Sequence, residues 1–275
     1  MLELMAMPFV TCLVLTGIFV YLGIHVVERE VIFVDLALAQ IAALGSVVAV
    51  LFEISIHSMQ AYFVSLGFTF AGAAIFSLTR LKEKIVPQEA IIGIVYVVAA
   101  ASAVLVLDRV PSEAHHIKEM LVGNILFIDI KQILGILALC GIIGLFHFIF
   151  RKIFIFISRQ PLEAQAQGIK VKWWDFLFYM TFGLVVASSV KIAGILLVFS
   201  FLIIPTVCSM LFSKDFGKRL IFGWGIGALA SLIGIYLSAK ADLPTGAAIV
   251  CSFGLLAVCA AAIKGFTAKR ILLLK

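Results

Sequence analysis

The chain has 275 residues, of which 64% are hydrophobic and only 13% are charged, and its mean hydropathy is +1.21. Soluble globular proteins carry about 25% charged residues because their surfaces face water, so this composition excludes a cytosolic enzyme, a disordered protein and a collagen-like fibre. The net charge of +6 comes from basic residues between apolar runs, where such residues set membrane orientation. We therefore expect a protein that is embedded in the lipid bilayer and has no nucleic-acid partner.

Runs of about 20 apolar residues, the length that a helix needs to cross a bilayer, recur along the chain. They predict nine spans, at about 4–27, 31–52, 61–79, 90–107, 132–150, 173–189, 192–212, 220–239 and 245–263. The first run is too long for a signal-peptide core and lacks a basic leader, so we interpret it as an uncleaved spanning helix. Because the runs are continuously apolar and do not alternate, they predict an all-α helical bundle rather than a barrel.

The number of spans depends on the segment from Trp173 to Phe212, which is interrupted only by Lys191. It forms either two spans or one span and a broken, half-inserted helix, so the prediction is eight or nine spans. Nine spans place all the basic segments on one side, which the positive-inside rule makes cytoplasmic, with the amino terminus outside. Those segments contain Arg80, Lys82 and Lys84; Arg151, Lys152, Arg159, Lys170 and Lys172; Lys214, Lys218 and Arg219; and Lys264, Lys269, Arg270 and Lys275.

Small residues at helical spacing predict close contacts between the spans. Gly223 and Gly227 form a GxxxG pair, with Ser231 one turn further on. The five cysteines lie inside apolar stretches and form no C-x-x-C pair, so we interpret them as small hydrophobic residues rather than a disulfide framework: Cys12, Cys140, Cys208, Cys251 and Cys259.

No G-x-x-x-x-G-K-[ST] loop, H-E-x-x-H motif or Ser-His-Asp arrangement stands out, so the chain is not expected to hydrolyse ATP itself. A protein with these features is a channel, a secondary carrier, a membrane-embedded enzyme or the permease half of a pump driven by another subunit. The longest cytoplasmic loop, 158–172, favours the last, because Pro161 can open a short helix and Gly168 can close it. Such a helix would be able to dock into a partner, although an ordinary amphipathic surface loop is the alternative.

Five segments of the sequence resemble one family in the same order along the chain. They read "EAIIGIVYVV" from Glu89, "EMLVGNILFI" from Glu119, "PLEAQAQGIKV" from Pro161, "SSVKIAGILLVFSFLIIPTVCSML" from Ser188 and "DLPTGAAIV" from Asp242. Together they resemble the membrane permease subunits of the ABC importers for zinc, manganese and iron. The resemblance implies a type II ABC importer permease-like fold, in which 1–275 is a single transmembrane permease domain with a cytoplasmic coupling loop at about 158–172.

The resemblance also implies partners and a location. The permease is expected to form a homodimer in the bacterial cytoplasmic (inner) membrane, resting on cytoplasmic ATPase subunits and receiving substrate from an extracytoplasmic binding protein. ATP and Mg would be bound by the ATPase, and this chain would bind no cofactor of its own. Glu163, Ala164 and Gly168 would lie in the helix that the ATPase grips. ATP-driven closure of such subunits can tilt spanning helices only through a rigid element between them.

The second span departs from the family, which usually has Asp-x-x-x-His there, an oxygen and a nitrogen ligand on one helical face. Counted back from Gly45, the family's His falls on Gln40 and its Asp on Leu36, with Asp35 one position early. The usual metal pair is therefore absent. Gln40 remains as a weak oxygen ligand, which leaves open whether a bare metal passes this helix.

Other ionisable residues each allow two interpretations. Asp35 has either an interface role that includes pairing with Arg29, or a role in translocation. Lys191 lies either at an outside turn or deep in the bundle, where its charge would repel a bare divalent cation. His25 and His147 stand alone on apolar helices and are interpreted as packed or hydrogen-bonded residues.

The outer loops contain candidate metal ligands. Glu113, His115, His116 and Glu119 lie within seven residues, and helical spacing would bring His115 and Glu119 onto one face. Imidazole and carboxylate groups suit Zn²⁺, Fe²⁺ or Mn²⁺, so these residues are a candidate entry site, with a solvated loop as the alternative. Glu53 and His57 form another i, i+4 pair at the outer end of the second span.

We therefore expect the permease subunit of an ABC importer that moves a divalent transition metal ion by alternating access. One alternative is a permease of the same fold for a chelated metal or a non-metal solute. The other is an ion-coupled secondary carrier, which would place paired charges near the bilayer midplane, where this sequence has few. A zinc enzyme built on the outer histidines lacks a general base at a defined spacing.

Overall fold

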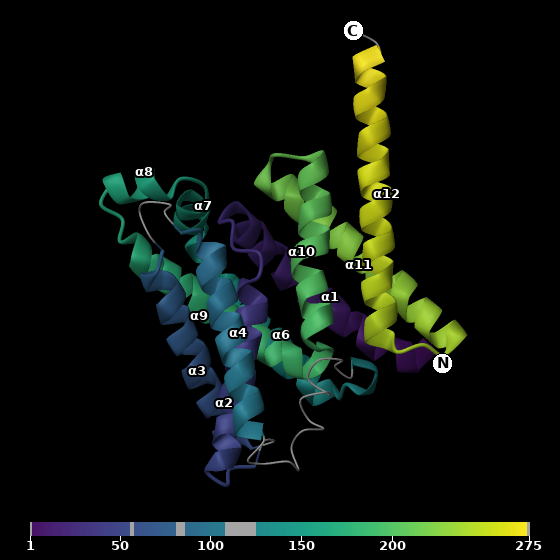
Figure 1. Cartoon of the computed structure of the whole chain (residues 1–275). Coiled ribbons are helices and arrows are strands. Elements are labelled where there is room, and N and C mark those ends of the chain that lie inside the picture. Colours follow the sequence, from purple (N-terminus) through teal and green to yellow (C-terminus); the bar gives the residue numbers. More distant parts are fainter. Residues whose placement is uncertain (1, 56–57, 81–85, 108–124, 274–275) are drawn as a thin grey trace. The chain divides into compact units, whose positions relative to one another are not determined.

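The computed structural model describes residues 2–55, 58–80, 86–107 and 125–273, and all the regular elements within these residues are helices (Figure 1). Nine helices of the described part are long and apolar enough to cross a membrane. The all-α prediction is confirmed, and the count of nine agrees with the distribution of basic residues. The helices are α1 (Leu2–Glu28), α2 (Val34–Leu51), α3 (Met59–Leu78), α4 (Gln88–Leu107), the 3-10 turn η2 (Ile125–Phe127), α6 (Ile130–Ile149), α7 (Arg151–Arg159), α8 (Pro161–Ala166), α9 (Val171–Ala193), α10 (Ile195–Phe212), α11 (Phe216–Ala241) and α12 (Thr245–Leu273).

Two predicted helix boundaries were wrong, because backbone conformation rather than charge sets where α2 begins and where α9 ends. The second span begins at Val34 rather than at 31, since Glu30 adopts a left-handed conformation with φ of 58° and turns the chain first. Helix α9 continues through Lys191 to Ala193. It stops where Gly194 has φ of 81°, a conformation that glycine tolerates and a helix does not. The ambiguous segment is thus two separate helices.

Side chains cap several of the helices. The Ser58 side chain accepts a hydrogen bond from the Ala61 N–H at the start of α3, and Asp215 does the same for the Lys218 N–H at the start of α11. These oxygens satisfy backbone donors that have no partner within the helix. At the other end of α11, Asp242 takes the left-handed conformation with φ of 52°. Such local signals set where the chain enters and leaves each span.

The chain divides into two compact units. The first comprises residues 1–27, 122–140 and 192–275, and therefore contains most of α1 together with α10, α11 and α12. Its helices approach closely at glycines: a Cβ at Gly227 would lie 2.4 Å from Cγ2 of Thr16, and one at Gly223 would lie 2.4 Å from Cγ1 of Val20. The predicted GxxxG pair is therefore the surface of α11 that packs on α1.

The second unit comprises residues 28–121 and 141–191, and therefore contains α2, α3, α4, α7, α8 and α9. In it α2 packs against α3 and α4. Its core includes Ala42 of α2, Leu66 of α3 and Ala187 of α9. Small residues allow this packing, since a Cβ at Gly45 would lie 2.8 Å from the Cα of Ser65. All the candidate site residues described below belong to this unit.

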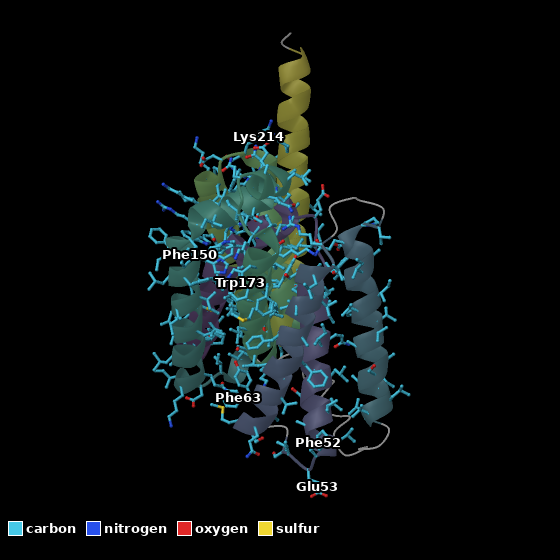
Figure 2. All side chains as sticks on the ribbon, turned by 90° about the vertical axis from the view of Figure 1, so that its left-hand side faces the viewer. Phe52, Glu53, Phe63, Phe150, Trp173 and Lys214 are labelled. Atoms are coloured by element: carbon cyan, nitrogen blue, oxygen red, sulfur yellow. The ribbon has the colours of Figure 1, made fainter. Side chains whose placement is uncertain are left out.

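Large apolar side chains cover the outward faces of several helices. On α4, Ile94, Val104 and Leu105 are each more than 60% exposed, and Leu145 of α6 and Val258 of α12 are similarly open. Figure 2 shows such side chains pointing away from the ribbon, with Phe52 and Glu53 at one end of the second unit and Phe150 towards the other. A soluble protein would not leave so much apolar surface in water, so these faces meet lipid or another hydrophobic chain.

Candidate functional site

Helix α8 is a single short helix whose two ends are closed by its own residues. Pro161 occupies its first turn, where the missing N–H costs nothing and the fixed φ suits a helix. At the other end the Ile169 N–H bonds to the Ala164 carbonyl and the Gly168 N–H to the Gln165 carbonyl. Gly168, with φ of 82°, thus completes a Schellman motif. The opening and closing residues predicted from the sequence are both confirmed.

One face of α8 is fixed and the rest is open. Ala164 is completely buried, whereas Glu163, Gln165 and Gly168 are exposed and Leu162 is 67% exposed. Figure 1 shows α8 next to α7 at one end of the second unit. The helix is neither enclosed by the spans nor detached from them. A second protein is therefore able to reach it.

Helix α7, which the sequence analysis did not predict, anchors α8 to the spans through its last two residues. Arg159 makes two hydrogen bonds from Nε to the Glu28 carboxylate, at 3.0 and 3.1 Å, and a third from Nη2 at 3.0 Å. The neighbouring Ser158 Oγ accepts a hydrogen bond from Nε of Arg29 at 2.9 Å. Two consecutive residues of α7 therefore contact two consecutive residues at the end of α1.

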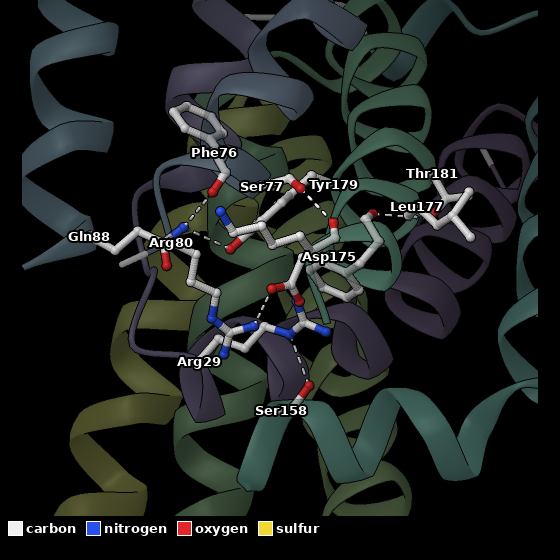
Figure 3. A network of polar contacts seen from close by, with 12 residues as sticks. Arg29, Phe76, Ser77, Arg80, Gln88, Ser158, Asp175, Leu177, Tyr179 and Thr181 are labelled. Carbon is white, nitrogen blue, oxygen red and sulfur yellow. Dashed lines mark hydrogen bonds and ion pairs between the residues drawn. The ribbon is translucent and has the colours of Figure 1, made fainter. Parts of the chain in front are cut away.

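Asp175 of α9 lies between two guanidinium groups (Figure 3). Its Oδ1 accepts a hydrogen bond from Nη1 of Arg29 at 2.7 Å, and its Oδ2 accepts one from Arg80, which follows α3. The Arg29 and Asp175 side chains are 1% and 0% exposed. The Arg29 guanidinium also lies 4.0 Å from the centre of the Phe178 ring, a cation–π contact. We call Arg29, Arg80, Ser158 and Asp175 the arginine hub.

The charges in the arginine hub support one another. Burial alone would lower the pKa of the Arg80 guanidinium, but the negative charge of Asp175 outweighs this and raises the pKa above its usual range. Arg80 therefore stays charged. With two cations around one anion the hub has an excess positive charge, and Nη2 of Arg29 is buried without a hydrogen-bond partner.

Polar residues of α4 bind the same end of the unit. Gln88 donates from Nε2 to the Phe76 carbonyl at 3.0 Å and contacts the Tyr179 hydroxyl at 3.3 Å. Oε1 of Glu89 accepts a hydrogen bond from the Phe33 N–H at 3.0 Å, one residue before α2 begins. Polar contacts thus join the starts of α2, α4 and α9 to the end of α3 at one end of the unit.

The expected pairing of Asp35 with Arg29 was wrong, because Arg29 binds Asp175 instead. Asp35 also does not reach water, since it is only 1% exposed, and its Oδ1 has no hydrogen-bond partner. Gln40 follows five positions after Asp35 on α2 and is half-buried. A buried carboxylate oxygen without a partner is costly, so packing does not explain why an aspartate occupies position 35.

Lys191 lies close to the turn that separates α9 from α10. It is exposed, in the last turn of α9, and its Nζ lies 4.6 Å from the centre of the Tyr62 ring. The Tyr62 hydroxyl is hydrogen bonded to Ser188 at 2.8 Å. Ser188 and Lys191 of α9 thus both contact one aromatic residue of α3. The alternative of a lysine deep in the bundle is not supported.

Most of the predicted outer metal ligands lie outside the described residues: His57, Glu113, His115, His116 and Glu119. Glu53 is described, and it is exposed in a left-handed turn beyond the end of α2. The helical spacing assumed for Glu53 and His57 was therefore wrong. No group of three or more potential ligands that could hold a metal ion occurs in the part of the chain that the structure describes.

His147 of α6 has the packed, hydrogen-bonded role that the sequence suggested. Nε2 of His147 is hydrogen bonded to Thr181 Oγ1 at 2.9 Å, and its ring stacks on Phe154 at 4.3 Å between centres. Asp175, by contrast, was overlooked. Its signal was available, since a lone acidic residue near the start of an otherwise apolar span requires a partner.

Comparison with known proteins identifies the family. The model of the ABC 3 transport family, ABC-3, matches residues 1–264. The chain belongs to the ABC-3 family. This confirms the resemblance seen in the sequence, and it makes the chain a multi-pass membrane component of a transport system rather than an enzyme.

Curated ABC-3 relatives are membrane proteins of transport systems. The manganese transport system membrane protein MntC of Listeria monocytogenes is 27% identical over 198 residues, 69% of each chain. MntB of Synechocystis is 28% identical over 70% of this chain and 61% of its own length. The chelated iron transport system membrane protein YfeD of Yersinia pestis is 26% identical over 62% of this chain and 57% of its own. The matches to MntB and YfeD thus span less than two thirds of those proteins.

Two solved structures share the fold. PsaBC from Streptococcus pneumoniae, in complex with a Fab, matches with a TM-score of 0.76 at 20% identity, covering 92% of this chain and 89% of that one. A metal-chelate type ABC transporter in an inward-facing conformation matches with a TM-score of 0.66 at 19% identity, covering 95% and 85%. These similarities confirm the expectation of an ABC transporter permease fold for this ABC-3 chain.

Proposed function

We propose that the chain is the permease subunit of an ABC importer that carries a divalent transition metal ion across the bacterial inner membrane by alternating access. The single observation that supports this most is α8, a pre-formed helix that is anchored on one face and open on the rest, in a chain of the ABC-3 family. A permease that is driven by a separate ATPase needs such a helix to receive force from it.

The partners follow from the same proposal. Residues 1–275 act as one permease domain, two copies of which form a homodimer on two cytoplasmic ATPase subunits that bind ATP and Mg. The ATPase grips the helix of the 158–172 segment: Glu163 is exposed for contact, Ala164 is buried and holds the helix in place, and Gly168 closes it. An extracytoplasmic binding protein delivers substrate to the outer side.

Manganese and iron are the proposed substrates, because the curated relatives are named for transport of these metals, and zinc belongs to the same class of ligands. Asp35 supports a cation path, since it is buried with a carboxylate oxygen that has no partner, and Gln40 adds a neutral oxygen. Lys191 lies near the outer entrance. Glu53, His57, Glu113, His115, His116 and Glu119 are proposed to capture the ion at the outer side.

A chelated metal is the second candidate substrate. The Asp-x-x-x-His pair is absent, and Lys191 places a positive charge near the outer end of α9, where it would repel a bare cation and attract an anionic chelate. One structural neighbour is described as a metal-chelate type transporter.

The experiment reconstitutes the transporter, purified through a tag on this chain, in proteoliposomes. We expect ATP-dependent uptake of Mn²⁺ or Fe²⁺, and ATPase activity stimulated by those ions. Stimulation by a metal chelate but not by the free ions would establish the second candidate. If no ATPase co-purifies and ATP drives no uptake, the importer proposal is wrong.

The capture residues require a separate measurement. Replacing His115 and His116 together by alanine should raise the metal concentration needed for half-maximal uptake, because two imidazole ligands are lost. Uptake that is unchanged at limiting metal would show that these histidines belong to a solvated loop.

A further inference from the structure

The arginine hub is placed where the segment proposed to receive force meets the spans. Helix α7 ends at Arg159, and α8 begins at Pro161 with only Gln160 between them. The last two residues of α7 are held by Glu28 and Arg29. The contacts are hydrogen bonds of 2.9 to 3.1 Å, so a displacement of about 1 Å either breaks them or moves the groups that they hold.

The two contacts differ in strength. The Arg159–Glu28 pair lies at the surface, where side-chain exposures of 39% and 12% allow water and salt to screen it. The Ser158–Arg29 bond is buried, and Arg29 is in turn bound to Asp175 with both side chains out of water. Breaking the Ser158–Arg29 bond would leave a guanidinium N–H buried without an acceptor, which is costly, so this connection stays intact when α7 moves.

Asp175 extends the connection to two spans. It belongs to α9, and its second oxygen binds Arg80 at the end of α3. Ser77 of α3 also donates from Oγ to the Lys172 carbonyl near the start of α9. A path of direct polar contacts therefore runs from α7 through Arg29 to α9, and from α9 to α3.

A purely structural role does not account for the charges. Two cations around one anion, with a guanidinium nitrogen left unpaired, cost desolvation energy that well-packed apolar residues would avoid. A charged network does supply directionality, because the guanidinium plane fixes the positions of Ser158 and Asp175 relative to each other. This property matters if the two residues must move together.

We infer that Arg29 is the positioning residue that transmits movement of the α7–α8 segment to α9 and α3, holding Ser158 on one side and Asp175 on the other. The inference rests on the proposed function, since it takes α8 as the helix that the ATPase moves. It adds which residue carries that movement into the spans, and it assigns the role to the buried bond rather than to the exposed Arg159–Glu28 pair.

The test uses the assembled transporter in proteoliposomes and measures the ATP hydrolysed per Mn²⁺ ion taken up. Ser158→Ala removes the bond that Arg29 donates to the Ser158 hydroxyl of α7, and Arg29→Lys keeps the charge but cannot bind Ser158 and Asp175 in the same fork geometry. Both should raise the ratio by about fivefold or more, the lower range of measured couplings between sites. Ser158→Thr keeps the hydroxyl group and should restore the ratio.

The matched control is Ser65→Ala. Ser65 of α3 is also buried, and its replacement also removes one hydrogen bond, from Oγ to the Ala42 carbonyl of α2 at 2.7 Å. It touches no residue of the hub. It should lower the melting temperature about as much as Ser158→Ala does and leave the ratio unchanged. Should Arg29→Lys fail to assemble, Ser158→Ala decides alone.

The possible results separate the inference from the proposed function. Wild-type transporter that takes up no Mn²⁺ with ATP would remove the proposed function and this inference with it. Wild-type transporter that couples, together with Ser158→Ala and Arg29→Lys variants that couple equally well, would overturn the inference alone. An increased ratio in Ser65→Ala as large as that in Ser158→Ala would also overturn it, because general loosening would then explain the effect.

Discussion

A close contact between α11 and α12 in the first unit predicts a large difference between two glycines of the same helix. A Cβ at Gly234 of α11 would lie 2.4 Å from the Cα of Ile249 and 2.8 Å from its nitrogen, on the backbone of α12. A Cβ at Gly225, two and a half turns earlier, would meet nothing within 4 Å. Gly234→Ala therefore creates a clash that no side-chain rotation relieves, whereas Gly225→Ala creates none.

The magnitude follows from this geometry. An ordinary contact needs about 3.4 Å or more, so the two helices must separate by about 1 Å at Gly234, and a gap of that size forfeits up to about half of each neighbouring dispersion contact. Overpacking of this kind costs about 1–3 kcal/mol. For a protein of this size the loss corresponds to a melting temperature lower by about 2–12 °C. Gly225→Ala should be neutral or stabilising, since alanine favours the helix by up to about 1 kcal/mol.

The assay is thermal unfolding of the detergent-purified permease, followed by tryptophan fluorescence, with both variants measured beside the wild type. Equal melting temperatures for Gly234→Ala and Gly225→Ala would refute the reasoning, since they would show that α11 and α12 do not approach so closely at Ile249.

Three further predictions concern single residues. Gly168→Val should disrupt the end of α8, because valine is strained at a φ of 82°, and should raise the ATP hydrolysed per ion without lowering the melting temperature of the spans; a normal ratio would show that α8 does not couple. Asp35→Asn should keep or raise thermal stability, since it removes a buried charge with an unpaired oxygen, yet should lower uptake; full uptake would exclude Asp35 from the path. Asp215→Ala removes the N-cap of α11 and should cost about 1 kcal/mol with transport retained, as measured by thermal unfolding and uptake.

Features set by local sequence were predicted well. Apolar runs located the nine candidate spans of the described residues, because the thickness of a bilayer fixes the number of consecutive apolar residues that a spanning helix needs. Pro161 and Gly168 identified both ends of α8, since proline at a first turn and glycine after a last turn act on their own neighbours. The GxxxG pair of α11 marked a close helix contact, because glycines one turn apart leave room for another helix.

Features that depend on distant partners were not predicted. Arg29 and Asp175 are 146 positions apart, and Arg80 and Asp175 are 95 apart, so one sequence offers no sign that they meet. The sequence left two interpretations of Lys191 open, because the choice depends on a residue of α3: its Nζ lies 4.6 Å from the centre of the Tyr62 ring, and the helix continues to Ala193. The Asp35–Arg29 pairing failed because Asp175, much further along the chain, binds the same guanidinium.

The way α8 is closed at both ends has a thermodynamic consequence. A loop that becomes helical only on docking must give up conformational freedom at that moment, which weakens association. Here Pro161 and the Schellman turn at Gly168 order the segment before any partner protein binds. The proposed ATPase would bind a helix that is already ordered. The free energy of binding would then remain available for moving the permease rather than for ordering α8.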